Sequence, residues 1–131
     1  MRDVLAPFEN LIQKYASQFD IEPHIIRAII MTESSGDPNA KGPTEDYGLM
    51  QMTLPTASRL GFSGTPEELF DPETNIRLGV KLLANIRAHG AAGLAEMYSV
   101  YNCGSAEAYK TDPAVARSVR HFLDNCALYA A

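Results

Sequence analysis

The stretch MTESSGDPNAKGPTEDYGLMQMTLPTA, residues 31–57, decides how this chain is interpreted. Isoleucines between residues 25 and 30 predict an apolar helix just before it, and Glu33 is the acidic residue at which that helix ends. A carboxyl group there holds its proton for two reasons, because burial disfavours the anion and so does the partly negative C-terminal end of a helix. We therefore expect Glu33 to be protonated near neutral pH and able to act as a general acid.

Apolar residues recur at helical spacing along most of the chain and predict a mostly α, compact single domain over residues 1–131. Proline after a capping residue opens several of the expected helices, as in Asp71-Pro72 and Asp112-Pro113. Residues 39–47 have no periodicity and predict a loop that contains at most a short β-hairpin. The fold class is six or seven helices, among them residues 3–18, 23–32, 55–60, 72–90, 94–101 and a last one from 113.

Composition sets limits on function. A chain of 131 residues with 46% apolar residues can bury a core without metals or cross-links. The net charge of −5 argues against a nucleic-acid surface, and no apolar run is long enough to span a membrane. Residues 1–9 contain no signal-peptide stretch, so we expect export through a removed signal, a larger parent protein or phage-driven release.

The cysteines, Cys103 and Cys126, leave two readings open: small unpaired side chains, or one disulfide that ties the last helix to the loop after Asn102. The three histidines show no ligand spacing with either cysteine. We therefore expect neither a metal nor another cofactor.

Ordered sequence blocks carry a resemblance to a known family. They are residues 33–57 with their ESS, DPNA, GLMQ and PTA segments, residues 71–79 with the pattern DPxxNIxxG, and residues 101–104 with the segment YNCG. Together they resemble the goose-type lysozyme and soluble lytic transglycosylase family, which cleaves peptidoglycan, over roughly residues 20–123. One block alone would be weak evidence, but their shared order makes the resemblance specific.

The resemblance implies a lysozyme-like fold and a role for each matching residue. Glu33 would be the catalytic acid and later the base, and Tyr101 would point its hydroxyl toward it. Gln51 would hold an N-acetyl group of the sugar, while Met50 would form an apolar wall beside the acid. The remaining candidates are Ser34 for shaping the site, Asn102 for supporting the loop on the substrate side or capping its helix, and Tyr47 for stacking on a sugar or closing the loop over the core.

The chain departs from the family pattern before the GLMQ segment. Gly42 stands where the resemblance leads us to expect serine, and Glu45 and Asp46 stand where it leads us to expect Gly-Ala; Val115 replaces a tyrosine of the last helix. The two acids are either solvated loop charges or a second carboxyl group facing Glu33. In the second case the enzyme would be an inverting lysozyme, which needs a carboxyl separation of roughly 6.5–9.5 Å.

The function that the resemblance implies is lytic transglycosylation of the β-1,4 bond between N-acetylmuramic acid and N-acetylglucosamine, with a 1,6-anhydro product. Hydrolysis of the same bond by Glu33 with Glu45 or Asp46 is the alternative, and a non-catalytic glycan-binding or phage structural module is the alternative of another class. The expected partner is a peptidoglycan strand, or a chito-oligosaccharide. We expect a monomer that acts on the cell wall, in the periplasm or outside the cell.

Overall fold

The computed structural model describes residues 3–130, and the chain there is mostly helical, as the sequence predicted. Six α-helices carry the fold within this part of the chain, together with short 3-10 helices. The α-helices are α1 (Glu9–Phe19), α2 (Pro23–Ser34), α3 (Leu54–Arg59), α4 (Pro72–Ala88), α5 (Leu94–Cys103) and α6 (Pro113–Ala130), and the 3-10 helices are η1 (Ala6–Phe8), η2 (Pro66–Phe70) and η3 (Ala108–Lys110).

The helix starts follow from local capping. The Asp71 carboxylate accepts a hydrogen bond from the Thr74 amide at 3.0 Å, and the Thr53 hydroxyl accepts one from the Thr56 amide at 3.3 Å. The first helix differs from the expectation, because residues 3–18 do not form one continuous helix: η1 precedes α1. Pro7 lies in η1 and explains the break, since proline has no amide hydrogen to donate and is disfavoured inside an α-helix.

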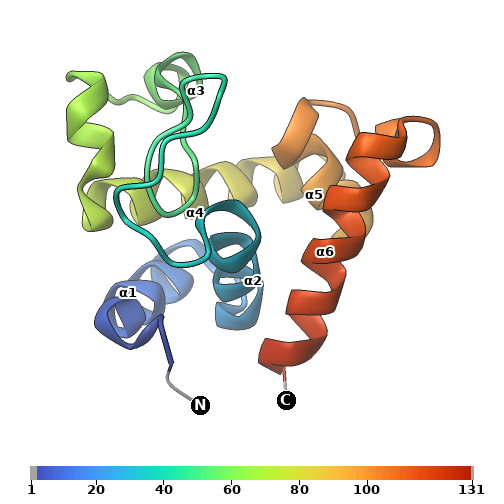
Figure 1. Ribbon diagram of the computed structural model, residues 1–131, viewed down its shortest axis with the longest axis horizontal. Coiled ribbons are helices and arrows are strands. Elements are labelled where there is room, and N and C mark those ends of the chain that lie inside the picture. Colours follow the sequence, from blue (N-terminus) through green and yellow to red (C-terminus); the bar gives the residue numbers. More distant parts are fainter. Residues whose placement is uncertain (1–2, 131) are drawn as a thin grey trace.

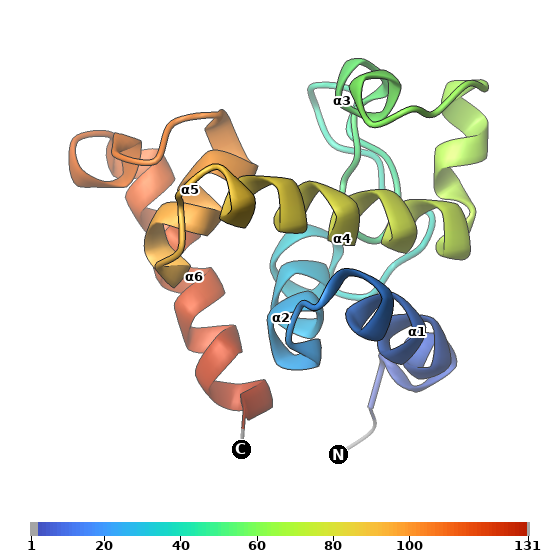
Figure 2. The same cartoon turned by 180° about the vertical axis from the view of Figure 1, so that it is seen from behind.

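Helix α4 crosses the molecule from one end to the other. Figure 2 shows it from behind, with α1 and α2 on one side, α3 on the other, and α5 and α6 at its C-terminal end. Helix α2 lies in the middle of the fold and packs most extensively against α6 (Figure 1). The isoleucines of α2 are fully buried there, together with Leu83 of α4 and Phe122 of α6.

A second, smaller core lies under α3 and the long loop that precedes it. Its buried members are Tyr47, Met52, Ala57, Leu60, Leu69 and Leu78. Leu82 of α4 packs against both cores, so it lies at the boundary between the two halves of the domain. This boundary is where a ligand cleft would be expected.

Residues 35–53 form the long loop, and the predicted possibility of a short strand pair is reduced to isolated bridges. Tyr47 bridges to Lys41 and to Met52, and no strand is formed within residues 3–130. A single side chain takes over much of the bonding that a sheet would supply. The amide nitrogen of Asn75, on α4, donates to the carbonyls of Tyr47 and Leu69, and its oxygen accepts from the Met50 amide, each at 2.7 Å.

Two further helices brace the same loop. The Ser34 hydroxyl, at the end of α2, donates to the Leu49 carbonyl at 2.7 Å, and the Tyr101 hydroxyl of α5 donates to the Met50 carbonyl at 2.7 Å. Gly48 permits this close packing, since its φ is +78° and a Cβ there would lie 2.6 Å from the Asn75 side-chain nitrogen. The GLMQ segment is therefore held from α2, α4 and α5 together.

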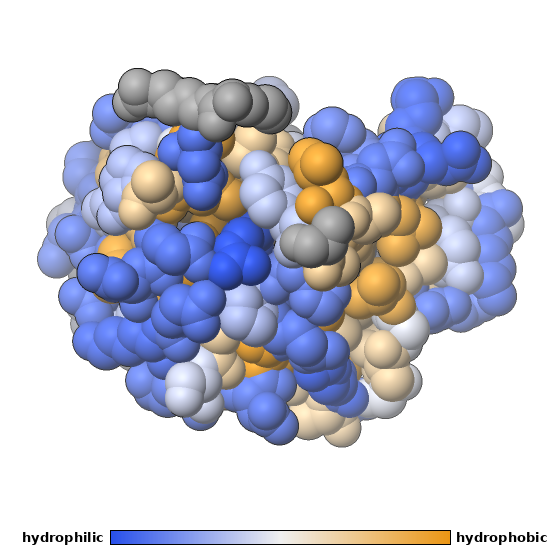
Figure 3. All heavy atoms as spheres, turned by 90° about the horizontal axis from the view of Figure 1, so that it is seen from below, coloured by the Kyte–Doolittle hydropathy of each residue, from blue (hydrophilic) through white to orange (hydrophobic). Residues whose placement is uncertain are grey.

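The cysteines are unpaired, which decides between the two readings left open by the sequence. Cys103 is exposed at the end of α5, whereas Cys126 is buried in the larger core. Of the helices in residues 3–130, none combines the length and the apolar character that crossing a membrane requires. Hydrophilic side chains cover much of the face seen from below, with hydrophobic ones over part of it (Figure 3). Leu128 is exposed, but isolated exposure of this kind does not mark a binding surface.

Candidate active site

Glu33 lies in a cavity of about 230 Å³ at the boundary between the two cores. It is the next-to-last residue of α2, so its side chain leaves the helix where the long loop begins. The wall opposite is formed by the long loop and α3, and the floor includes Leu82 of α4. The lining residues are Glu33, Thr44, Asp46, Gln51, Met52, Thr53, Thr56, Leu82, Tyr101 and Asn102.

The environment of Glu33 favours its neutral form. Burial raises the pKa of Glu33 from 4.5 to about 7; the negative charge of Asp46 acts in the same direction, and a hydrogen bond from Tyr98 opposes both. Desolvation therefore dominates, as the sequence predicted for an acid at the end of a buried helix. A carboxyl group with this pKa can both give and take a proton near neutral pH.

The tyrosine that is hydrogen-bonded to the acid is Tyr98, which the sequence did not single out, whereas Tyr101 lines the same cavity as the acid without bonding it. The Tyr98 hydroxyl donates a short hydrogen bond to Glu33 Oε2, while the Tyr101 hydroxyl is used on the Met50 carbonyl. Both rings lie on one face of α5 because residues three apart are neighbours on a helix, and their centroids are 6.1 Å apart. Tyr101 still lines the cavity, whereas Tyr98 stacks on Phe122 at 4.7 Å behind it.

Gln51 lines the cavity, and the nitrogen of its side-chain amide already has hydrogen-bond partners. Its nitrogen donates to the carbonyls of Ala40 at 3.1 Å and Gly48 at 2.9 Å. The amide oxygen is left to accept a hydrogen bond, which suits the N–H of an acetamido group. A sugar-binding role for Gln51 stays a prediction, in which its amide would accept a hydrogen bond rather than donate one.

Met50 does not form the apolar wall that was expected. Its side chain is fully buried and packs so closely on Gly79 that a Cβ at residue 79 would lie 2.4 Å from its sulfur. It supports the cavity from below, and the apolar side chains of the lining are Met52 and Leu82. Residues 48–51 form a turn between the bridged residues Tyr47 and Met52, with positive φ at Gly48 and Gln51, so the sequence spacing alone does not tell which of these side chains enters the cavity.

Ser34, Tyr47 and Asn102 take different places. Ser34 does not line the cavity, because its hydroxyl bonds the carbonyls of Ile30 and Leu49. Tyr47 is buried in the smaller core with its ring edge-on to Phe70, so it closes the loop over that core. Asn102 lines the cavity at the exposed end of α5. It does not cap the helix, which ends at Gly104 with φ +85°.

The two acids of the loop, Glu45 and Asp46, line different pockets. Asp46 lines the cavity with Glu33, and both of its carboxylate oxygens accept from the Thr44 hydroxyl, at 3.0 and 2.9 Å. Glu45 has a φ of +58°, is exposed, and lines a neighbouring pocket instead. Asp46 is therefore the residue of the pair that can act beside Glu33. The other lining residues carry no sequence pattern that marks a site; they are Thr44, Met52, Thr53, Thr56 and Leu82.

The comparison with protein families decides the affiliation. Residues 10–117 match the family described as the transglycosylase SLT domain. The chain belongs to this family. An endo-type membrane-bound lytic murein transglycosylase A from Salmonella paratyphi B is 36% identical to this SLT domain over 89 residues, 63% of the chain. The match spans 44% of that relative, so the chain corresponds to less than half of its length.

Solved structures share the architecture of this SLT domain. The 70-kDa soluble lytic transglycosylase from Escherichia coli has 25% identity and a TM-score of 0.85 over 95% of the chain, which is 24% of that enzyme. An inactive glutamate-to-glutamine mutant of the lytic transglycosylase Slt from Pseudomonas aeruginosa has 20% identity and a TM-score of 0.83 over the same share. These likenesses bear out the expected lysozyme-like helical fold.

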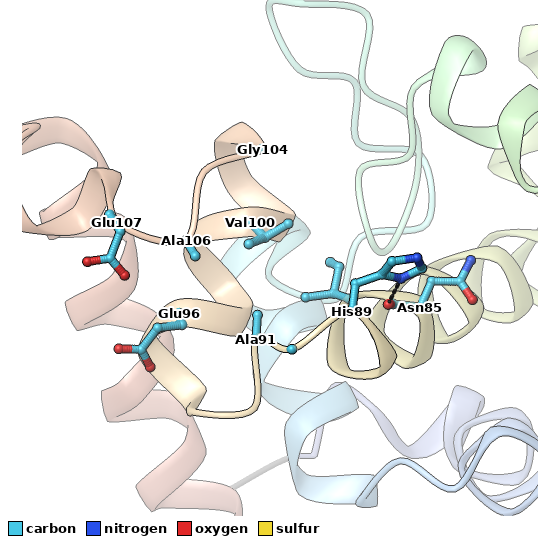
Figure 4. Close-up of a pocket in the computed structure, with 10 residues that line it drawn as sticks. Asn85, His89, Ala91, Glu96, Val100, Gly104, Ala106 and Glu107 are labelled. Atoms are coloured by element: carbon cyan, nitrogen blue, oxygen red, sulfur yellow. Dashed lines mark hydrogen bonds between the residues drawn. The ribbon is translucent and has the colours of Figure 1, made fainter.

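A larger hollow of about 640 Å³ lies at the C-terminal end of α4 in the SLT domain (Figure 4). Its acids are already partnered: Tyr109 donates to Glu96 at 2.8 Å, and Lys110 pairs with Glu107 at 2.6 Å. His89 uses Nδ1 on the Asn85 carbonyl. Within residues 3–130, no cluster of three or more His, Cys, Asp or Glu is placed to hold a metal ion.

Proposed function

We propose that this domain cleaves peptidoglycan between N-acetylmuramic acid and N-acetylglucosamine by lytic transglycosylation, with Glu33 as the general acid and base. The observation that carries the proposal is one carboxyl group with a pKa of about 7, set in a cavity at the boundary of the two cores. The relatives add support, since they are described as lytic transglycosylases.

The reaction needs a single carboxyl group in two successive states. Protonated Glu33 gives its proton to the bridging oxygen of the glycosidic bond, and the substrate's own N-acetyl oxygen stabilises the cationic sugar. Ionised Glu33 then takes the proton of the C6 hydroxyl as that oxygen attacks C1. The product is a 1,6-anhydro sugar and no water is consumed. A pKa near the working pH serves both steps, because neither protonation state is strongly disfavoured.

Neighbouring side chains would assist this reaction. The Tyr98 hydroxyl stabilises the ionised form of Glu33 between the steps, since a hydrogen bond to a carboxylate favours the charge. The amide oxygen of Gln51 can accept from an acetamido N–H, and the partly exposed Leu82 offers apolar surface to a sugar ring. The Glu-to-Gln mutant of the Pseudomonas relative, described as inactive, agrees with dependence on one acid.

Mass spectrometry of a peptidoglycan digest tests the chemistry directly. Transglycosylation yields anhydro-muropeptides, which are lighter by one water than the products of hydrolysis. We expect the anhydro series from wild-type protein. No turnover of purified cell walls would instead identify a glycan-binding or structural module, and hydrated products would exclude transglycosylation.

Hydrolysis is a second candidate because of Asp46. This carboxylate shares the cavity with Glu33 and could orient a water molecule on the far side of the sugar. Gly42 leaves room for it, since a Cβ there would lie 2.9 Å from an Asp46 oxygen and 2.6 Å from the Gln51 oxygen. In a hydrolase, Asp46→Asn would lose as much activity as Glu33→Gln. We expect Asp46→Asn to lose little activity. We also expect the protein to act on the cell wall as a monomer that needs no cofactor.

A further inference from the structure

A second pocket, of about 370 Å³, adjoins the catalytic cavity. The two share Thr44 and Thr53 in their linings, so they lie side by side at these residues. The hollow at the end of α4 shares no lining residue with the cavity. The pocket is lined by Thr44, Glu45, Tyr47, Thr53, Leu54, Pro55 and Pro66.

The pocket combines an apolar wall with an exposed acid. Leu54, Pro55 and Pro66 supply aliphatic surface, while Glu45 is exposed at its edge. None of the ion pairs formed within residues 3–130 involves Glu45. The nearby Lys41 ammonium lies over the Tyr47 ring, 5.7 Å from its centroid. The charges of Glu45, Glu67 and Asp46 contribute, after burial, to raising the pKa of Tyr47, which indicates a negative potential.

A ligand that fits this chemistry has an aliphatic chain that ends in a cation. The peptide stem on the muramic acid of peptidoglycan carries a diamino acid, whose aliphatic side chain bears an ammonium group. Aliphatic carbons pack on apolar surface while the ammonium stays at the wet, charged edge. A stem of three residues reaches about 10 Å, at ~3.3 Å per residue, so a group attached beside the cleaved bond can reach the adjoining pocket.

We propose that the pocket between α3 and the long loop binds the amine-bearing side chain of a peptide stem, and that Glu45 pairs with its ammonium group. This inference rests on the proposed function and makes it more specific. An ammonium group would give Glu45, an exposed carboxylate that interacts with the Tyr47 hydroxyl, an ion-pair partner that a neutral sugar does not supply. The domain would therefore cleave strands with free stem amines faster than strands whose amines are blocked.

Acetylation of the substrate tests this pairing. Peptidoglycan with free stem amines is compared with the same material after treatment with acetic anhydride, which turns each ammonium into a neutral amide. Because a partly exposed ion pair contributes at most about 1 kcal/mol, we expect wild-type kcat/KM to fall about three- to fivefold, mainly through KM. Glu45→Gln should show that loss on free-amine substrate and no further loss after acetylation.

Two controls separate the outcomes. Glu107→Gln removes an equivalent exposed charge at the hollow of Figure 4 and should respond to acetylation as the wild type does. Equal sensitivity of Glu45→Gln and wild type to acetylation would overturn the pocket proposal. So would an equal loss by Glu45→Gln on strands stripped of their stems. If Glu33→Gln stays active on every substrate, the proposed function itself is wrong.

Discussion

The hollow at the end of α4 has a volume of about 640 Å³, whereas the cavity that holds Glu33 has about 230 Å³. In the larger hollow, Glu96 is bonded to Tyr109, which lowers its pKa, and Glu107 is paired with Lys110. In the smaller cavity, burial raises the pKa of Glu33 to about 7. The difference teaches that the state of the acid, and not the size of the space, indicates where proton transfer can occur.

The largest expected contrast is between Glu33→Gln and Glu107→Gln, one in each hollow. Removing Glu33, the proposed general acid, should lower the rate of cell-wall cleavage by at least ~100-fold. Glu107→Gln should remain close to wild type, since it removes an exposed ion pair. Turbidity loss of purified cell walls, checked by release of muropeptides, measures both. Similar cleavage rates for the two variants would show that the two hollows do not differ in function.

The same Glu33→Gln variant should unfold less readily than wild type at alkaline pH. The folded-state pKa of Glu33 is raised from 4.5 to about 7, so the folded protein holds this proton more tightly than the unfolded chain. Wild-type stability therefore falls between these pH values, and the variant avoids the loss. We expect a gain of about 1–3 kcal/mol at pH 8 and little at pH 4, at ~1.4 kcal/mol per pKa unit. Urea unfolding at the two pH values measures it, and an equal gain at both would contradict it.

Smaller effects should distinguish the groups that surround the acid. Wild-type kcat/KM should fall above a pH of about 7 as Glu33 ionises. Tyr98→Phe removes a hydrogen bond that lowers the pKa of Glu33, so the fall should move to higher pH. Asp46→Asn removes a charge that raises it, so the fall should move to lower pH. Complete pH profiles of the two variants test these opposite shifts, and shifts in the same direction would show that the cavity geometry had changed.

Much of the fold could be predicted because its signals are local. Asp71 and Thr53 cap helices through contacts three residues away, so the starts of α4 and α3 can be inferred from short segments. The first helix was misjudged because its apolar spacing continues through Pro7, where the helix is interrupted. Apolar spacing reports which face is buried, but it does not by itself report a break in the backbone hydrogen bonding.

A residue of the site could be predicted only where its own position in the sequence determines its environment. Glu33 could be identified from the end of its helix, whereas Tyr98 depends on how α5 packs against α2. Glu45 and Asp46 could not be told apart, because the left-handed backbone at Glu45 decides which side chain enters the cavity. The surroundings of Tyr98, Glu45 and Asp46 are set by contacts between segments that are distant in the sequence. A single sequence does not show these contacts.

The hydrogen bonds of Asn75 bear on the order in which parts of the domain fold. Its amide joins α4 to Tyr47 and Met50, which lie 28 and 25 positions earlier in the chain. Without a sheet, the loop has little reason to order before α4 docks, because its main anchor is a side chain of that helix. Amides of the loop should accordingly gain protection from hydrogen exchange together with α4, and protection of the loop ahead of α4 would contradict this.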